Sequence, residues 1–113
     1  MLWGSGTPRR EFLHVDDLAA ACEFLLRHYN DDVAINVGTG VDVTIRELAT
    51  SIAAVAGYDG PVRWDSTKPD GTPRKLLDVG RINALGWRAE IGLEEGIKDA
   101  YGWFLEHLDQ ARL

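Results

Sequence analysis

The sequence predicts an α/β fold, because short apolar runs typical of strands alternate along the chain with longer segments of helical periodicity. Residues 15–29 and 93–108 place apolar side chains three and four positions apart, as helices with one buried face do. Residues 33–38, VAINVG, form an apolar run of the kind found in strands covered on both faces. Such a strand needs a larger parallel sheet than the few strands expected here, so we expect the chain to form part of a larger fold.

The first part of the chain should contain a loop, a strand and a helix. Residues 3–10 have the glycine and proline content of a loop, and residues 11–15, EFLHV, resemble a short strand. The helix of residues 15–29 follows, with Asp16 or Asp17 as its expected cap. Its buried face should carry Leu18, Ala21, Cys22, Leu25 and Tyr29.

A second helix is expected in the middle of the chain, after the strand 33–38 has ended at the GTG turn of residues 38–40. Thr44 and Glu47 have the spacing of a capping box, which marks the start of this helix. Gly57 stands where a C-terminal cap is expected.

The last part of the chain should contain one strand, a charged loop and two helices. Residues 61–65, PVRWD, alternate as a strand does, and the loop KPDGTPRKLLDV, residues 68–79, follows. A short helix should stop near Gly86, and residues 93–108 should form the final helix. Its inner face should carry Leu93, Ile97, Tyr101, Phe104 and Leu108.

Composition excludes several classes of protein. A net charge of −6 and a pI near 4.9 argue against a general nucleic-acid binder. No apolar run approaches the roughly 20 residues of a membrane span, and the N-terminus lacks the apolar core of a signal peptide. Cys22 is the one cysteine, so no internal disulfide can form and a cytoplasmic location is expected. The histidines are scattered, so no metal site is expected: His14, His28 and His107.

Several polar and aromatic residues have an ordinary structural explanation beside a functional one. The GTG turn resembles a phosphate-binding turn but lacks the G-x-G-x-x-G pattern, so a plain turn is favoured. A satisfied core histidine is favoured for His14 over a general base. Capping is favoured for Asp16 and Asp17 over acid/base work. Core packing is expected for Cys22, Trp87 and Trp103.

Two clusters favour a bound ligand. Trp3 with Arg9 and Arg10, around a glycine- and proline-rich loop, suits a nucleobase or sugar next to a diphosphate. In residues 68–79, a rigid turn presents Asp70, which can accept hydrogen bonds from sugar hydroxyls. The same loop carries Lys68, Arg74 and Lys75. Basic clusters in an acidic protein indicate an anionic ligand, and a solvated surface patch is the alternative.

Five segments resemble the C-terminal third of the GDP-L-fucose synthase family, within the extended short-chain dehydrogenases/reductases. They are WGSGTPRREFLHVDDLA, INVGTG, TIRELA, KPDGTPRKLLDV, and LGW with the following LEEGIKDAYGWFLEHL. The resemblance covers about residues 3–108. Segments such as NVGTG occur widely among the extended enzymes, whereas KPDGTPRKLLDV is specific to the fucose synthases.

The resemblance implies an enzyme that converts GDP-4-keto-6-deoxy-D-mannose to GDP-L-fucose. Two ring carbons beside the ketone are inverted, and the ketone is reduced with hydride from NADPH. Trp3, Arg10 and Asp70 match substrate-binding positions of the family, whereas Arg9 stands where an apolar residue is common. Lys68, Arg74 and Lys75 lie in the matching motif as further candidate substrate contacts. A homodimer without nucleic-acid or membrane partners is implied for the complete enzyme.

The resemblance also divides the chain into two parts of an extended, Rossmann-type fold. Residues 1–43 would complete a dinucleotide-binding domain that is otherwise absent, and residues 44–113 would form the substrate-binding domain. The family's Gly-rich loop, catalytic serine, Tyr-x-x-x-Lys pair and acid/base Cys and His are expected upstream. No catalytic residue is therefore expected here, and the fragment alone should be inactive. The three tyrosines are followed four positions later by Val33, Val62 and Leu105.

Two alternatives to this interpretation stay open. The chain could be a non-catalytic nucleotide-sugar-binding or subunit-assembly module, with the apolar faces of its first and last helices meeting another subunit. It could also be part of another extended-family sugar-nucleotide epimerase or dehydratase.

Overall fold

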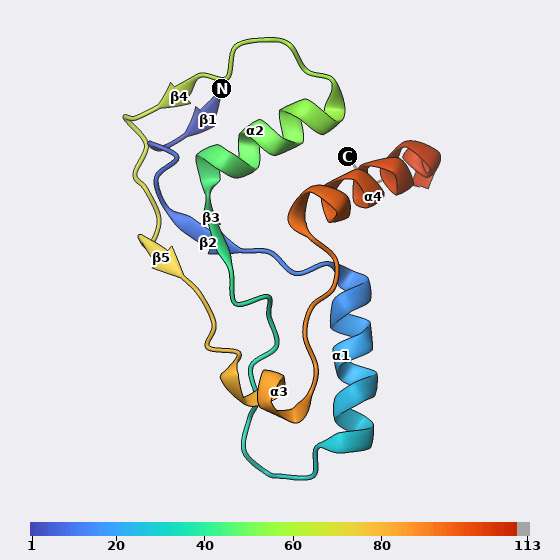
Figure 1. Ribbon diagram of the computed structural model, residues 1–113. Helices are drawn as coiled ribbons and strands as arrows, with labels where there is room; N and C mark the ends of the chain where they lie inside the picture. The colour runs from blue at the N-terminus through green and yellow to red at the C-terminus, as the bar shows by residue number, and fades with distance from the viewer. Residues whose placement is uncertain (111–113) are drawn as a thin grey trace.

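The computed structural model describes residues 1–110, a range that contains four helices and five short strands (Figure 1). The helices are α1 (Val15–His28), α2 (Ile45–Ala56), α3 (Gly80–Leu85) and α4 (Leu93–Glu106), and Leu108–Gln110 form a 3-10 turn. The strands are β1 (Leu2–Trp3), β2 (Arg9–Glu11), β3 (Asp42–Thr44), β4 (Trp64–Asp65) and β5 (Arg74–Lys75). This mixture, with parallel pairs among the strands, confirms the predicted α/β class. None of the helices in residues 1–110 is both long and apolar enough to cross a membrane.

The strands form two small sheets. In the three-stranded sheet, β2 lies between β3 and β5. It pairs antiparallel with β3, where Arg10 is opposite Val43, and parallel with β5, where Arg10 is opposite Lys75. A separate parallel pair joins β1 to β4, with Trp3 opposite Asp65. These pairings hold the start of the chain against the loop that follows α2.

The predicted ends of α2 and α3 are confirmed. The Thr44 hydroxyl accepts the Glu47 backbone N–H, and the Glu47 carboxylate accepts the Thr44 N–H at 2.7 Å, which completes the capping box. Gly57 ends α2 with a φ of 66°, and Gly86 ends α3 with a φ of 109°. Both values lie in the left-handed region that glycine tolerates best.

The expected cap of α1 is wrong. His14 is the N-cap, and its Nδ1 accepts the backbone N–H of Asp16 at 3.2 Å. Asp16 and Asp17 lie inside the first turn of the helix, where their negative charge still complements the helix dipole. His14 therefore precedes a helix and does not lie within a strand. Its side chain is only 10% exposed.

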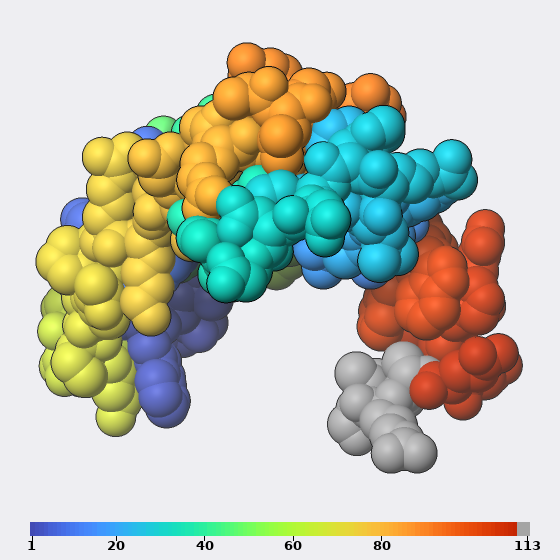
Figure 2. Space-filling view, turned by 90° about the horizontal axis from the view of Figure 1, so that it is seen from below, coloured from blue at the N-terminus to red at the C-terminus, as the bar shows by residue number. Residues whose placement is uncertain are grey.

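A small core joins α1 to residues 35–37 and to the segment around α3. Its buried members are Ala21, Val79, Ile82 and Trp87, in agreement with the prediction for Trp87. Partly buried side chains around them are Leu13, Phe24, Leu25, Ile35, Val37 and Ala89. The radius of gyration is 16.7 Å, larger than the roughly 13 Å of a compact chain of this length. The described residues form an arch, hollowed between the β1/β4 end and α4 (Figure 2).

The predicted strand boundaries differ most from the structure. Residues 3–10, expected to be a loop, contribute to β1 and β2, and the strand expected at 11–15 is replaced by β2, which ends at Glu11. The strand expected at 61–65 is limited to β4. Residues 33–38 are not a strand, because within residues 1–110 no other segment pairs with them.

Some side chains that were expected in the core are exposed. Leu18 is 44% exposed and Cys22 is also exposed, so the predicted buried face of α1 is only partly correct. Trp103, expected in the core, is 59% exposed. On α4 the inner face is confirmed at its half-buried members, Leu93, Ile97, Tyr101 and Phe104, but Leu108 is exposed.

Candidate ligand-binding site

The alternation of side chains along β2 separates two arginines that are neighbours in sequence. Successive residues of a strand point to opposite faces of the sheet, so Arg9 and Arg10 project in opposite directions. Their partners on β5 divide in the same way, because Arg9 is opposite Arg74 and Arg10 is opposite Lys75. The seven candidate ligand contacts therefore do not form one surface.

Arg9 and Arg74 converge on a buried carboxylate that sequence reasoning did not anticipate. Arg9 Nε donates to Asp42 Oδ1 at 2.9 Å, and Arg74 Nε donates to Asp42 Oδ2 at 2.5 Å. The Asp42 side chain is only 4% exposed. The hydrogen bond from Arg74, and then that from Arg9, lower the pKa of Asp42 below its usual value. Both arginines thus form structural ion pairs with Asp42, so fewer N–H groups of each guanidinium remain to bind a ligand.

The GTG turn is occupied by a carboxylate of the protein. Glu11 Oε2 accepts the Gly40 backbone N–H at 2.6 Å and the Thr39 hydroxyl at 3.3 Å. A Cβ on Gly38 would lie 2.7–2.9 Å from the Glu11 carboxyl group, so this turn closes tightly on Glu11. The Glu11 carboxylate stands where a phosphate would have to bind, which supports the plain turn over a phosphate site.

Arg10 lies on the opposite face of the sheet, beside a cavity of about 300 Å³. Its Nη1 donates to the backbone carbonyl of Arg9 at 2.6 Å, and a Cβ on Gly71 would be 3.1 Å from Nη2. No carboxylate among residues 1–110 pairs with this guanidinium at salt-bridge distance. The cavity is lined further by Phe12, Thr39, Val41, Val43 and residues 89–93. An arginine without a counterion on a mainly apolar cavity is suited to an anionic group of a ligand.

Asp70 is fixed by Ser5, which sequence reasoning also missed. Asp70 Oδ1 accepts the Ser5 backbone N–H at 2.8 Å, and Oδ2 accepts the Ser5 hydroxyl at 2.6 Å. The hydroxyl, and then the backbone N–H, lower the pKa of Asp70, so the group is ionised at neutral pH. Each carboxylate oxygen keeps a second lone pair with which it can accept a further hydrogen bond.

Trp3 and Lys68 lie next to this anchored loop. The Trp3 side chain is 75% exposed, and Lys68 Nζ is 5.3 Å from the centre of its ring. These residues stay near Asp70 because β1 pairs with β4 and because Ser5 donates hydrogen bonds to Asp70. Gly71, the next residue of the loop, lies close to the Arg10 guanidinium. The structure thus places Lys68 beside Trp3, Asp70 beside Ser5 and Arg10 beside Gly71. It directs Arg9 and Arg74 toward Asp42 and leaves Lys75 exposed on β5.

His14, Asp16 and Asp99 group together where α1 meets α4, with one ligand-type atom of each within 4.8 Å of the others. Both nitrogens of His14 already have partners. Nδ1 accepts the Asp16 N–H, and Nε2 is 3.1 Å from Asp99 Oδ2. This arrangement agrees with a satisfied histidine that connects two helices.

Three comparisons with known proteins bear on the family. A sequence model described as the NAD dependent epimerase/dehydratase family matches residues 1–38. A putative GDP-L-fucose synthase 2 of Arabidopsis thaliana is 52% identical over 112 residues, which cover 99% of this chain and 34% of the relative. A GDP-L-fucose synthase of Escherichia coli K12 is 57% identical over 121 aligned positions, 99% of this chain and 38% of the relative.

The fold comparison agrees with the sequence comparison. The crystal structure of a GDP-L-fucose synthetase from Naegleria fowleri bound to NADP superposes with a TM-score of 0.92 at 26% identity, over 98% of this chain and 36% of that chain. This chain spans about a third of the length of the relatives that it matches. The chain is therefore similar over nearly its whole length to one portion of the GDP-L-fucose synthases, and it has the fold of a part of a Rossmann-type extended short-chain dehydrogenase/reductase.

Proposed function

We propose that this chain is the C-terminal, substrate-binding portion of a GDP-L-fucose synthase. The complete enzyme would convert GDP-4-keto-6-deoxy-D-mannose to GDP-L-fucose by 3,5-epimerisation and NADPH-dependent reduction of the 4-ketone. The observation that carries the proposal is the Arg10 guanidinium, which lies beside the cavity and the Asp70–Gly71 turn without a carboxylate partner in residues 1–110. The similarity to GDP-L-fucose synthases supports it.

Each proposed contact has a physical basis. A guanidinium donates two parallel hydrogen bonds to a phosphate, so Arg10 would hold the diphosphate. The ionised Asp70, fixed by Ser5, would accept hydrogen bonds from sugar hydroxyls. The exposed Trp3 ring would pack against a flat or apolar face of the ligand, with Lys68 adding positive charge nearby. Lys75, Arg9 and Arg74 would contribute mainly long-range attraction.

Calorimetric titration of the 113-residue chain with GDP tests this proposal. We expect binding, and we expect Arg10→Ala to weaken it by about tenfold or more because a charge-assisted hydrogen bond is lost. Arg27→Ala is the matched control, because Arg27 is exposed on α1 and pairs with Glu23 at 2.7 Å. Equal affinities of the Arg10 and Arg27 variants would contradict the assignment of Arg10.

We propose that NADPH binds mainly outside this chain. Cofactor phosphates bind to free backbone amides of glycine-rich turns, and the Gly40 amide of the 38–40 turn is occupied by Glu11. The turn therefore does not fit such a phosphate. The chain alone should not oxidise NADPH in the presence of the keto sugar, and absorbance at the NADPH band would measure this. A cytoplasmic homodimer is proposed for the complete enzyme.

We further propose that residues 1–43 pack against the dinucleotide-binding part of the complete enzyme. One face of α1 carries the core members Ala21 and Leu25, whereas Leu18, Cys22 and Leu26 form an apolar stripe on an exposed face. Leu26 is 88% exposed. An exposed apolar stripe of this kind indicates a surface that another part of the protein covers.

Complementation would test this packing. The chain would be mixed with the remaining two thirds of the E. coli relative, and NADPH oxidation with the keto sugar would be measured. Leu26→Asp should abolish recovered activity without changing the thermal unfolding of the chain, because a charge would be buried at the contact. Leu105→Asp, at an exposed position of α4, is the control. Equal recovery with both variants would refute the contact.

The identity of the sugar needs its own experiment, because relatives differ in substrate. A GDP-L-colitose synthase of Yersinia pseudotuberculosis is 38% identical over 105 residues. Titration with GDP-L-fucose, other GDP-sugars and UDP-glucose would separate a fucose synthase from another epimerase or reductase of the family. An assembly module would instead form an oligomer in sedimentation without affinity for any nucleotide.

A further inference from the structure

Asp17 is a buried carboxylate of α1 that binds backbone amides far away in sequence. Asp17 is only 5% exposed. Asp17 Oδ2 accepts the Ile91 N–H at 2.9 Å, and the Glu90 N–H is 3.2 Å from both carboxylate oxygens. No lysine or arginine in the described part of the chain pairs with Asp17 at salt-bridge distance. The two amides and the N-terminal turn of α1 are therefore what stabilise this buried charge.

The amides that Asp17 holds belong to one wall of the Arg10 cavity. Residues 89–93 line that cavity together with Arg10, Thr39 and Val43. Residues 89–92 are irregular backbone between α3 and α4, so no helix or sheet ladder orients them, and Leu93 is the first residue of α4. Asp17 also borders a separate groove on the α1 side of this segment. Asp17 thus holds two amides of the wall without lining the Arg10 cavity itself.

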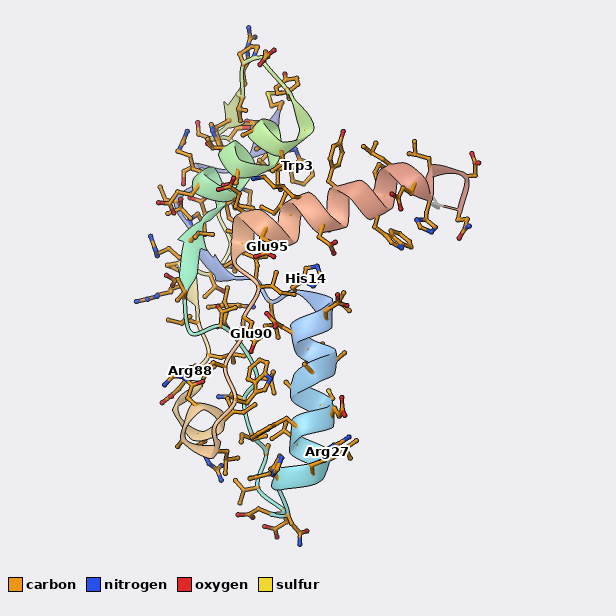
Figure 3. All side chains as sticks on the ribbon, turned by 45° about the vertical axis from the view of Figure 1, so that its right-hand side comes forward. Trp3, His14, Arg27, Arg88, Glu90 and Glu95 are labelled. Atoms are coloured by element: carbon orange, nitrogen blue, oxygen red, sulfur yellow. The ribbon has the colours of Figure 1, made fainter. Side chains whose placement is uncertain are left out.

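His14, the N-cap of α1, provides a second attachment, to the helix α4 that follows the wall. Its Nε2 is 3.1 Å from Asp99 Oδ2 on α4, which follows the wall directly. A Cβ on Gly96 would lie 3.1 Å from the His14 ring, so glycine allows α4 to approach this closely. Figure 3 shows His14 at the start of α1 and Glu90 beside this helix. The N-terminal turn of α1 therefore holds both the wall and the beginning of α4.

We propose that Asp17 is a positioning residue that sets the distance between the 89–93 wall and Arg10, and thereby the affinity for the GDP moiety. The proposal rests on the function proposed above, because it takes the Arg10 cavity as the ligand site. An irregular segment whose two amides donate charge-assisted hydrogen bonds to one carboxylate has one preferred position. Without them it samples several positions, and ordering it on binding costs affinity.

Amide hydrogen exchange and GDP titration, applied to the same 113-residue variants, test the proposal. In Asp17→Ala we expect the Glu90 and Ile91 amides to exchange at least about tenfold faster and the Kd for GDP to rise about tenfold. Asp17→Asn keeps the size and one acceptor oxygen, so an intermediate effect is expected on both. Asp59→Asn is the control, because Asp59 is an exposed acid that lies outside α1 and does not line the Arg10 cavity. This substitution should change neither the exchange rates of the Glu90 and Ile91 amides nor the Kd for GDP.

The exchange of α2 amides separates positioning from general destabilisation. A positioning role predicts faster exchange at the wall with unchanged exchange in α2. Uniform acceleration, unfolding of both Asp17 variants, or a loosened wall with unchanged GDP affinity would each overturn the proposal. If the unsubstituted chain does not bind GDP, the proposed function fails, and the exchange of Glu90 and Ile91 still decides whether Asp17 holds the wall.

Discussion

Replacing Gly6 with alanine is expected to lower the free energy of unfolding by about 3 kcal/mol, for two separate reasons. Gly6 has a φ of +78°, a conformation that costs alanine about 1 kcal/mol. In addition, a Cβ there would lie 2.6–2.9 Å from the Trp64 ring. The ring cannot easily retreat, because the Arg46 guanidinium lies 4.6 Å from its centre and the Arg46 N–H donates to the Gly6 carbonyl. Urea unfolding of the two proteins would measure the loss.

Gly57→Ala is the matched control for this prediction. Gly57 also has a positive φ, +66°, but nothing lies within 4 Å of a Cβ at that position. Only the backbone cost of about 1 kcal/mol is expected there. Equal losses in the two variants would show that contact with Trp64 is unimportant. Trp64→Leu combined with Gly6→Ala should recover part of the loss, because the smaller side chain relieves the contact.

The helices could be predicted from the sequence because their signals are local. The capping box of Thr44 and Glu47, and the glycines at positions 57 and 86, act within a few residues of the helix ends that they specify. His14 was the exception, because a histidine at an N-cap is less common than the aspartates that follow it. Its role is defined partly by Asp99, which is 85 positions away.

The strands could not be predicted with the same success, because strand pairing depends on distant residues. Arg9 and Arg10 lie in the stretch whose composition indicates a loop, yet they belong to β2, which pairs with β3 and β5 on its two sides. The opposite error concerned residues 33–38, whose apolar pattern predicts a strand. Without a partner in residues 1–110, that pattern cannot produce a ladder.

Periodicity also misplaced part of α1, because this helix has apolar residues on more than one face. Ala21 and Leu25 pack in the core, whereas Leu18 and Cys22 are exposed. A helical repeat shows that apolar faces exist but does not say which of them the rest of the chain covers.

For the candidate site, the sequence indicated two segments that pair with each other in the structure, but it could not divide their residues by role. Trp3, Arg10 and Asp70 stay predicted substrate contacts, and their neighbourhood in space supports them. Arg9 and Arg74 were grouped with them because they are adjacent in sequence. Recognising β2 as a strand would have separated Arg9 from Arg10 by alternation. Asp42 carried no comparable signal, since its ion pairs join residues 32 and 33 positions apart.

Asp42→Asn is expected to have the second large effect on stability, because it removes the charge between two arginines. Arg9 and Arg74 lie opposite each other on β2 and β5 and both donate to the Asp42 carboxylate. With a neutral amide, the two guanidinium groups repel each other without a counterion. We expect the melting temperature at pH 7 to fall by roughly 5–10 °C. Glu94→Gln, which removes an exposed charge paired with Lys98, should change it little.

The pH dependence of this difference identifies its electrostatic origin. The pKa of Asp42 in the folded protein is lowered below the ordinary value of 3.8, first by Arg74 and then by Arg9. A lowered pKa contributes stability above the ordinary pKa, and this contribution is lost as the pH falls through the folded value. The gap between wild type and Asp42→Asn should therefore stay constant from pH 7 to about 5 and close below about 4. Other carboxylates with a lowered pKa whose causes do not involve Asp42, such as Asp70 and Glu94, titrate in both proteins and cancel in the comparison. Thermal melts across this pH range measure the gap, and a gap that persists unchanged at pH 3 would mean that packing, rather than the ion pairs, explains the role of Asp42.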